Sequence, residues 1–126
     1  MREGIVAGIV VGLVLALTTA SGQAAPPLFP LVGDWDQYFR VDAESTARDG
    51  RALVSGRVSN ISNWRADRIQ LLIEGLDASG QPVTQRVVWL GTDLSAGTHS
   101  FFEVPVPTAA SYRVSVFAFD SSRTRC

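Results

Sequence analysis

The residues that could perform chemistry are few and scattered along the chain. It has one histidine, His99, and one cysteine, Cys126 at the last position, so the chain cannot assemble a His/Cys metal site. A serine hydrolase needs its nucleophile on a strained, glycine-bounded turn beside the histidine, and no serine here has that setting. We expect His99 to be an exposed structural residue on a strand. The sequence therefore predicts a protein that is not an enzyme, with no cofactor.

The other chemical signals are also weak. Asp34 and Asp36 flank a tryptophan at a spacing that could touch calcium, but no further run of ligands follows, so we expect no calcium site. The glycines are dispersed at predicted turns and form no phosphate-binding loop. Eleven basic residues, all arginine, face twelve acidic ones for a net charge of −1. Because so small a charge creates no long-range field, we expect no nucleic-acid partner.

Binding is the remaining class of function, and exposed aromatic or arginine side chains are its best candidates. Trp and Arg are enriched where an interface buries an anchor. The candidate partner contacts are Trp35, Tyr38, Trp64 and Arg65. The three aromatic residues among them could instead form a carbohydrate-binding face, or cover the ends of a core. We expect Trp89 to be the core tryptophan of the domain.

The chain begins with an apolar leader, which has two interpretations. From Gly4 to Gly33 there is no charged residue. As a signal peptide, the leader over residues 1–25 would have its cleavage site after Ala24, with the small residues Gly22 and Ala24 at the −3 and −1 positions. As an anchor, the same stretch is long enough to span a bilayer as a helix. Either reading places the rest of the chain outside the cytoplasm, in the periplasm or the extracellular space.

Small residues at four-residue spacing favour the anchor. In lipid, helices associate where such residues let their backbones approach closely, whereas a signal peptide needs no groove of this kind. We therefore expect a single-pass membrane helix with its amino terminus in the cytoplasm, which packs against helices of other membrane subunits. The residues predicted to form this helix-packing groove are Gly4, Gly8, Gly12 and Ala16.

A proline-rich linker over residues 26–37 is expected to join the leader to the domain. Pro26, Pro27 and Pro30 fix φ and bias the preceding residues away from helix, so the connection should be stiff and extended. At a membrane surface, Trp35 and Tyr38 would suit the interfacial belt of aromatic residues.

From residue 38 to residue 126 the hydrophobic pattern has a period of two, which is typical of β-strands. Apolar and polar residues alternate over 39–44, 52–59, 69–74, 83–90, 102–106 and 112–117. Asp49-Gly50 predicts a tight hairpin, and Pro105 and Pro107 indicate either a strand at a sheet edge or the end of strand pairing. Six or seven short strands without helical segments predict an all-β fold, an antiparallel immunoglobulin-like β-sandwich.

The turn and core residues of this domain carry a family resemblance. They are Gly56-Arg-Val58-Ser-Asn60, the run from Ile69 through Asp77 to Gly80, Leu90-Gly91, Leu94, Gly97 and Phe102. This pattern resembles the bacterial extracytoplasmic immunoglobulin-like domains of the FxLYD type over roughly residues 51–119. The resemblance implies a noncatalytic module attached to an envelope anchor. Asn60-Ile-Ser62 also matches the acceptor pattern for N-glycosylation.

These observations lead to two hypotheses about function. The first is a noncatalytic, membrane-anchored accessory subunit, whose domain helps to assemble or stabilise a larger membrane protein complex. The alternative is a secreted or anchored module that binds a carbohydrate or a peptide.

Overall fold

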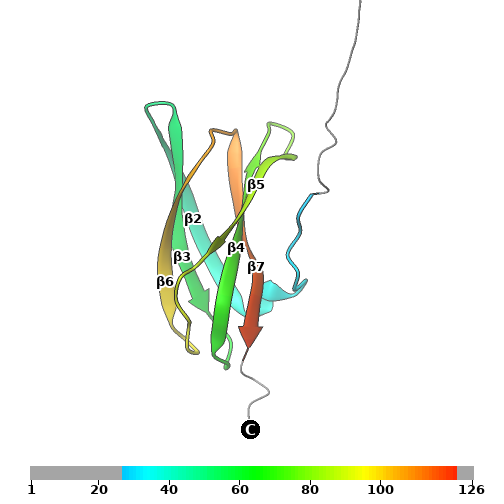
Figure 1. The fold of residues 1–126 in the computed structure, drawn as a ribbon, viewed down its shortest axis with the longest axis vertical. Helices are drawn as coiled ribbons and strands as arrows, with labels where there is room; N and C mark the ends of the chain where they lie inside the picture. The colour runs from blue at the N-terminus through cyan, green and yellow to red at the C-terminus, as the bar shows by residue number, and fades with distance from the viewer. Residues whose placement is uncertain (1–26, 122–126) are drawn as a thin grey trace, which may run out of the picture.

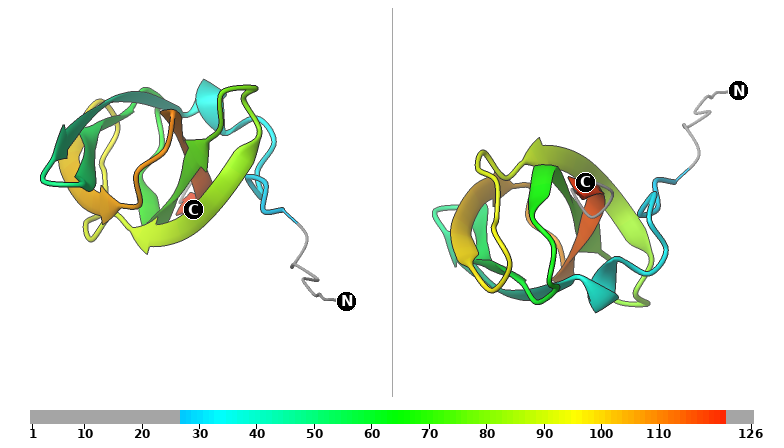
Figure 2. Two further views of the ribbon diagram at one scale, coloured as in Figure 1. Left: turned by 90° about the horizontal axis from the view of Figure 1, so that it is seen from above. Right: turned by 90° about the horizontal axis from the view of Figure 1, so that it is seen from below.

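In the computed structural model, which describes residues 27–121, six strands form two antiparallel three-stranded sheets (Figure 1). A short 3-10 turn, η1 (Trp35–Gln37), precedes the first strand. The sheets have the orders β2-β3-β6 and β5-β4-β7, and the end-on views in Figure 2 show them as two facing layers. The strands are β2 (Phe39–Arg48), β3 (Arg51–Asn60), β4 (Ala66–Leu76), β5 (Pro82–Trp89), β6 (His99–Val106) and β7 (Ser111–Ser121).

The predicted all-β class is confirmed for these residues. Within residues 27–121, no helix is long and apolar enough to cross a membrane. The helix predicted over residues 1–25, with Gly4, Gly8, Gly12 and Ala16, lies outside the described part of the chain.

The hairpin between β2 and β3 follows from its two-residue turn. Asp49 has φ of 53° and Gly50 has φ of 74°, the pair of positive values that a type I′ turn requires and that Asp-Gly adopts readily. Arg48 and Arg51 close the hairpin as partners. The prediction of a tight hairpin at this dipeptide is therefore confirmed. Of the two alternatives for Pro105, the edge position is confirmed, because among the described strands β6 pairs with β3 alone.

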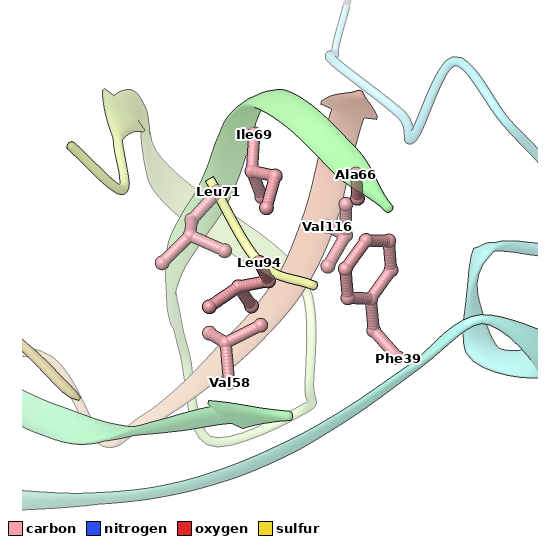
Figure 3. Close-up of a cluster of buried hydrophobic side chains, with 7 residues drawn as sticks. All are labelled: Phe39, Val58, Ala66, Ile69, Leu71, Leu94 and Val116. Atoms are coloured by element: carbon pink, nitrogen blue, oxygen red, sulfur yellow. The ribbon is translucent and has the colours of Figure 1, made fainter. Parts of the chain in front are cut away.

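The main core lies between the two sheets (Figure 3). Val58 projects from one sheet, Leu71 and Val116 project from the other, and all three are fully buried. Leu94, from the connection between β5 and β6, points into the middle of the cluster and closes it. The inward residues alternate along their strands, as a half-buried antiparallel sheet requires.

The expectation that Trp89 is the core tryptophan is wrong. Trp89 is 62% exposed, and the neighbouring residues Val88 and Leu90 pack against the core instead. The alternation along β5 therefore has the opposite phase from the predicted one. The physical reason is that β5 has apolar residues on both faces, so its pattern did not reveal which face turns inward.

The central strand β4 is buried on both faces. Leu71 and Ile73 point toward the core, and by alternation Leu72 and Glu74 lie on the outer face, where both are also buried. Glu74, only 4% exposed, accepts hydrogen bonds from Arg113 Nε and Gln85 Nε2, each at 2.8 Å. The bond to Glu74, more than their charge attraction, raises the pKa of Arg113. A buried carboxylate is tolerated here because both of its oxygens have partners.

Candidate interaction surfaces

Two of the predicted contacts lie at one end of the sandwich: Trp35 begins η1, and Tyr38 directly follows it. Both are half-buried and pack against the main core. The ring of Tyr38 is tilted against that of Phe119, with 5.3 Å between the ring centroids. The Tyr38 carbonyl also accepts a hydrogen bond of 2.8 Å from the amide of Ile61. These two aromatic residues thus cover the end of the core, one of the roles expected of them.

The other two predicted contacts, Trp64 and Arg65, lie in the connection between β3 and β4, at the same end as η1 (Figure 1). Trp64 is partly exposed. Arg65 donates from Nε to Asp67 Oδ1 at 2.9 Å and from Nη2 to Asp93 Oδ2 at 2.5 Å. The hydrogen bond to Asp67, together with the charges of both carboxylates, raises the pKa of Arg65. Arg65 thus joins the β3–β4 connection to the connection that follows β5.

The amide side chain of Asn60 holds this end together. Its Nδ2 donates to the carbonyls of Trp64 at 2.7 Å and Leu94 at 3.0 Å, while its Oδ1 accepts from the amide and hydroxyl of Ser62. The residue is 1% exposed. In the folded domain, the acceptor residue of the glycosylation pattern, Asn60, is therefore buried within a structural network. Its Nδ2, the atom that would carry the sugar, donates to two carbonyls instead.

One hollow in the described surface was not predicted from the sequence. It lies on the outer side of the β2-β3-β6 sheet and has a volume of about 730 Å³. Two cross-strand rows of side chains border it, and the backbone of the row between them, whose side chains turn inward, forms the floor. We call this surface the front hollow. The rows are Asp42, Arg57 and Phe101, and Glu44, Ser55 and Glu103; the floor is Ala43, Gly56 and Phe102.

Phe101 is the main apolar group of the front hollow. It is 69% exposed, and the ring of His99 meets it edge-on with 5.4 Å between the centroids. His99 itself is exposed, as predicted. An aromatic residue in the polar phase of an alternating strand is the sequence signal that could have identified this surface, since Phe101 stands between His99 and Glu103 on the outward face.

The front hollow carries a negative charge. Three carboxylates, Asp42, Glu44 and Glu103, border it with one guanidinium, that of Arg57. Arg57 Nη2 lies 3.8 Å from Asp42 Oδ2, which leaves an excess of two negative charges. Within residues 27–121 no group of three or more possible metal ligands comes together. The excess of negative charge beside the exposed ring of Phe101 suits this surface to contact a positively charged group next to an apolar one.

The fold assigns the described residues to the class of all-β proteins built from two antiparallel sheets. No family model, no curated protein and no solved structure matches the chain.

Proposed function

We propose that this chain is a noncatalytic, membrane-anchored accessory protein of a larger membrane assembly. Residues 1–25 form its single membrane helix, and its β-domain lies outside the cytoplasm and contacts a partner through the front hollow. The observation that carries this proposal is the exposure of Phe101 among the carboxylates of that hollow. Aromatic anchors surrounded by polar residues are typical of protein interfaces.

The sheet order supports an immunoglobulin-like description of the domain. If β3, β4, β6 and β7 correspond to strands B, C, E and F, then β2 corresponds to A and β5 to C′. Strands A, B and E share one sheet of an immunoglobulin domain, and C′, C and F share the other. Such domains commonly serve as noncatalytic recognition or spacer modules, and the resemblance to the FxLYD type agrees with this role.

The charge of the front hollow defines the partner that fits it best. Glu44 and Glu103 lie in one row and have no arginine in it, so they favour a partner surface with lysine or arginine side chains. Phe101 offers an apolar face to the stems of such side chains or to an aromatic ring. We therefore propose that the partner presents a basic, partly apolar surface outside the cytoplasm.

A photo-crosslinking amino acid at position 101 should capture this partner in native membranes, while the same amino acid at position 83 should not. Val83 is a matched control because it is also exposed but belongs to the other sheet. Glu103→Arg should weaken the complex by about 10-fold or more, because it reverses a charge beside the anchor. Equal crosslinking from both positions, or a complex of unchanged affinity with Glu103→Arg, would contradict the proposed use of the hollow.

The membrane helix has its own test. Gly8→Leu should reduce recovery of the partner in mild detergent, because leucine fills the proposed groove. Val10→Leu is the matched control, since two residues along a helix is about 200° around its axis. Mass spectrometry of the native protein checks that residues 1–24 are retained. Partner recovery that Gly8→Leu leaves unchanged would contradict the groove.

The alternative, a secreted or anchored ligand-binding module, draws on the same surface. An exposed aromatic ring beside carboxylates also suits a carbohydrate, whose hydroxyl groups bond to carboxylates while its apolar face stacks on the ring. Glycan-array binding that depends on Phe101, or on Trp64 at the other candidate surface, would favour this alternative over the accessory role.

A further inference from the structure

We infer that the outer face of the β5-β4-β7 sheet lies against the membrane surface, with Phe29, Leu31 and Trp89 in its interfacial layer. This inference rests on the proposed membrane anchor and goes beyond it, because an anchored domain could also lie far from the bilayer at the end of a flexible linker. The argument depends on how the start of the described chain is attached to the sheet.

Residues 28–31 are fastened to the β5-β4-β7 sheet by hydrogen bonds. The amide of Leu28 donates to Gln85 Oε1, and Gln85 Nε2 donates back to the Leu28 carbonyl, both at 2.9 Å. Three residues later, the amide of Leu31 donates to the Phe117 carbonyl at 2.8 Å. Gln85 is itself held by the buried carboxylate of Glu74. This segment is therefore part of the sheet surface rather than a free spacer.

The attachment sets a short limit on the distance from the bilayer. If the membrane helix ends near Ala25, two residues lie between its end and the fastened residue Leu28, which makes three residue-to-residue steps. A fully extended chain covers at most about 3.6 Å per residue, so the tether reaches about 11 Å. The polar interfacial layer on each side of a bilayer is itself roughly 5–8 Å thick. The sheet surface around Gln85 must therefore stand at or near the lipid headgroups.

The side chains on this face fit that location. Phe29 is 70% exposed, Leu31 is 71% exposed, and Trp89 shares the outward phase of β5 with Gln85. Aromatic residues, tryptophan above all, are enriched where membrane meets water. The guanidinium of Arg113 lies on the same face, beside Glu74, and is half exposed, so it can meet anionic headgroups. The front hollow is on the opposite sheet and would face away from the lipid, toward a partner.

Depth-dependent fluorescence quenching tests this orientation in the full chain. The protein is reconstituted into phosphatidylcholine–phosphatidylglycerol vesicles, with Trp35→Phe and Trp64→Phe so that Trp89 is the sole tryptophan. We expect phospholipids brominated near the top of the acyl chain to reduce its emission about two-fold. The matched control has Phe101→Trp and phenylalanine at all three native tryptophan positions, which puts the sole tryptophan on the opposite sheet, where brominated lipids should leave it unquenched.

Separate readouts distinguish failure of this inference from failure of the anchor. Release of the protein by alkaline carbonate would overturn the proposed anchor. Retention in carbonate with an unquenched Trp89 would overturn the inference about orientation but not the anchor. Shielding of Trp89 from aqueous acrylamide without quenching by brominated lipids would also overturn the inference, because it would mean that protein, not lipid, covers this face. Gln85→Ala should loosen the attachment and reduce quenching without releasing the protein from the vesicles.

A photoactivatable lipid provides a test that needs no substitution. In the unmodified chain, its adducts should map to the peptides that contain residues 28–31 and Trp89. Adducts on the β6 peptide around Phe101 instead would reverse the proposed orientation.

Discussion

Gly56→Ala is expected to destabilise the domain by about 3 kcal/mol. A Cβ atom at this position would lie 2.2 Å from the Asp42 carbonyl oxygen and 2.8 Å from the Ala43 Cα. Both are backbone atoms of the neighbouring strand β2, so no side-chain rotation can relieve the overlap. The two strands would have to separate, which would disturb the hydrogen bonds of their ladder. Urea unfolding should show a lower midpoint with an unchanged slope.

The control for this substitution is Gly33→Ala, whose added Cβ would meet nothing within 4 Å. It should leave the midpoint nearly unchanged, because the replacement adds one methyl group at an open surface position. A Gly56→Ala variant as stable as Gly33→Ala would contradict the close approach of β2 to β3. Because Gly56 forms part of the floor of the front hollow, the same substitution should also weaken crosslinking from position 101.

Asn60→Asp is expected to destabilise the domain by a similar amount, about 3 kcal/mol at neutral pH. The substitution keeps the shape of the side chain but replaces the donor Nδ2 by an oxygen. That oxygen would face the carbonyls of Trp64 and Leu94, which lie 2.7 and 3.0 Å from the native nitrogen. A negative charge would thus be buried against two acceptors. Thermal or urea unfolding measures the loss directly.

The pH dependence of this variant gives an independent check. Burial and the two carbonyls should raise the pKa of the introduced carboxyl above its unfolded value, because they disfavour the charged form. The destabilisation should therefore be largest above that raised pKa and should lessen as the pH falls through it, since the protonated acid can donate one bond again. Asn63→Asp, at an exposed position of the same connection, should show neither effect. Equal stability of the two variants would contradict the network.

The strands and the tight hairpin could be predicted because their causes are local. The alternation of apolar and polar residues along the strand is enough to place Val58 on the inward face. Asp49-Gly50 favours a type I′ turn by its own conformational preference, and it adopts positive φ angles here. The resemblance motif around Gly56 and Asn60 also has a physical explanation in the structure. Gly56 permits the close approach of β2, Val58 fills the core, and Asn60 joins two connections.

The surfaces could not be predicted in the same way, because they depend on pairing between distant segments. The inward phase of β5 is decided by its partner β4, which is buried on both faces, so Trp89 could not be placed from its own neighbours. The front hollow needs the register of three strands before Phe101 and Glu103 can be seen as its borders. The bond between Leu28 and Gln85 joins residues 57 positions apart.

The burial of Asn60 has a practical consequence for producing this protein in eukaryotic secretory cells. Oligosaccharide transfer acts on nascent chains, so a sugar would be attached to the Asn60 amide before β3 and the connection after β5 come together. The modified nitrogen would keep a single hydrogen for two carbonyl partners, and the bulky glycan would have to pass through the closed end of the sandwich. A bacterial host avoids that obstacle and keeps the bond from the Ser62 hydroxyl to Asn60 Oδ1.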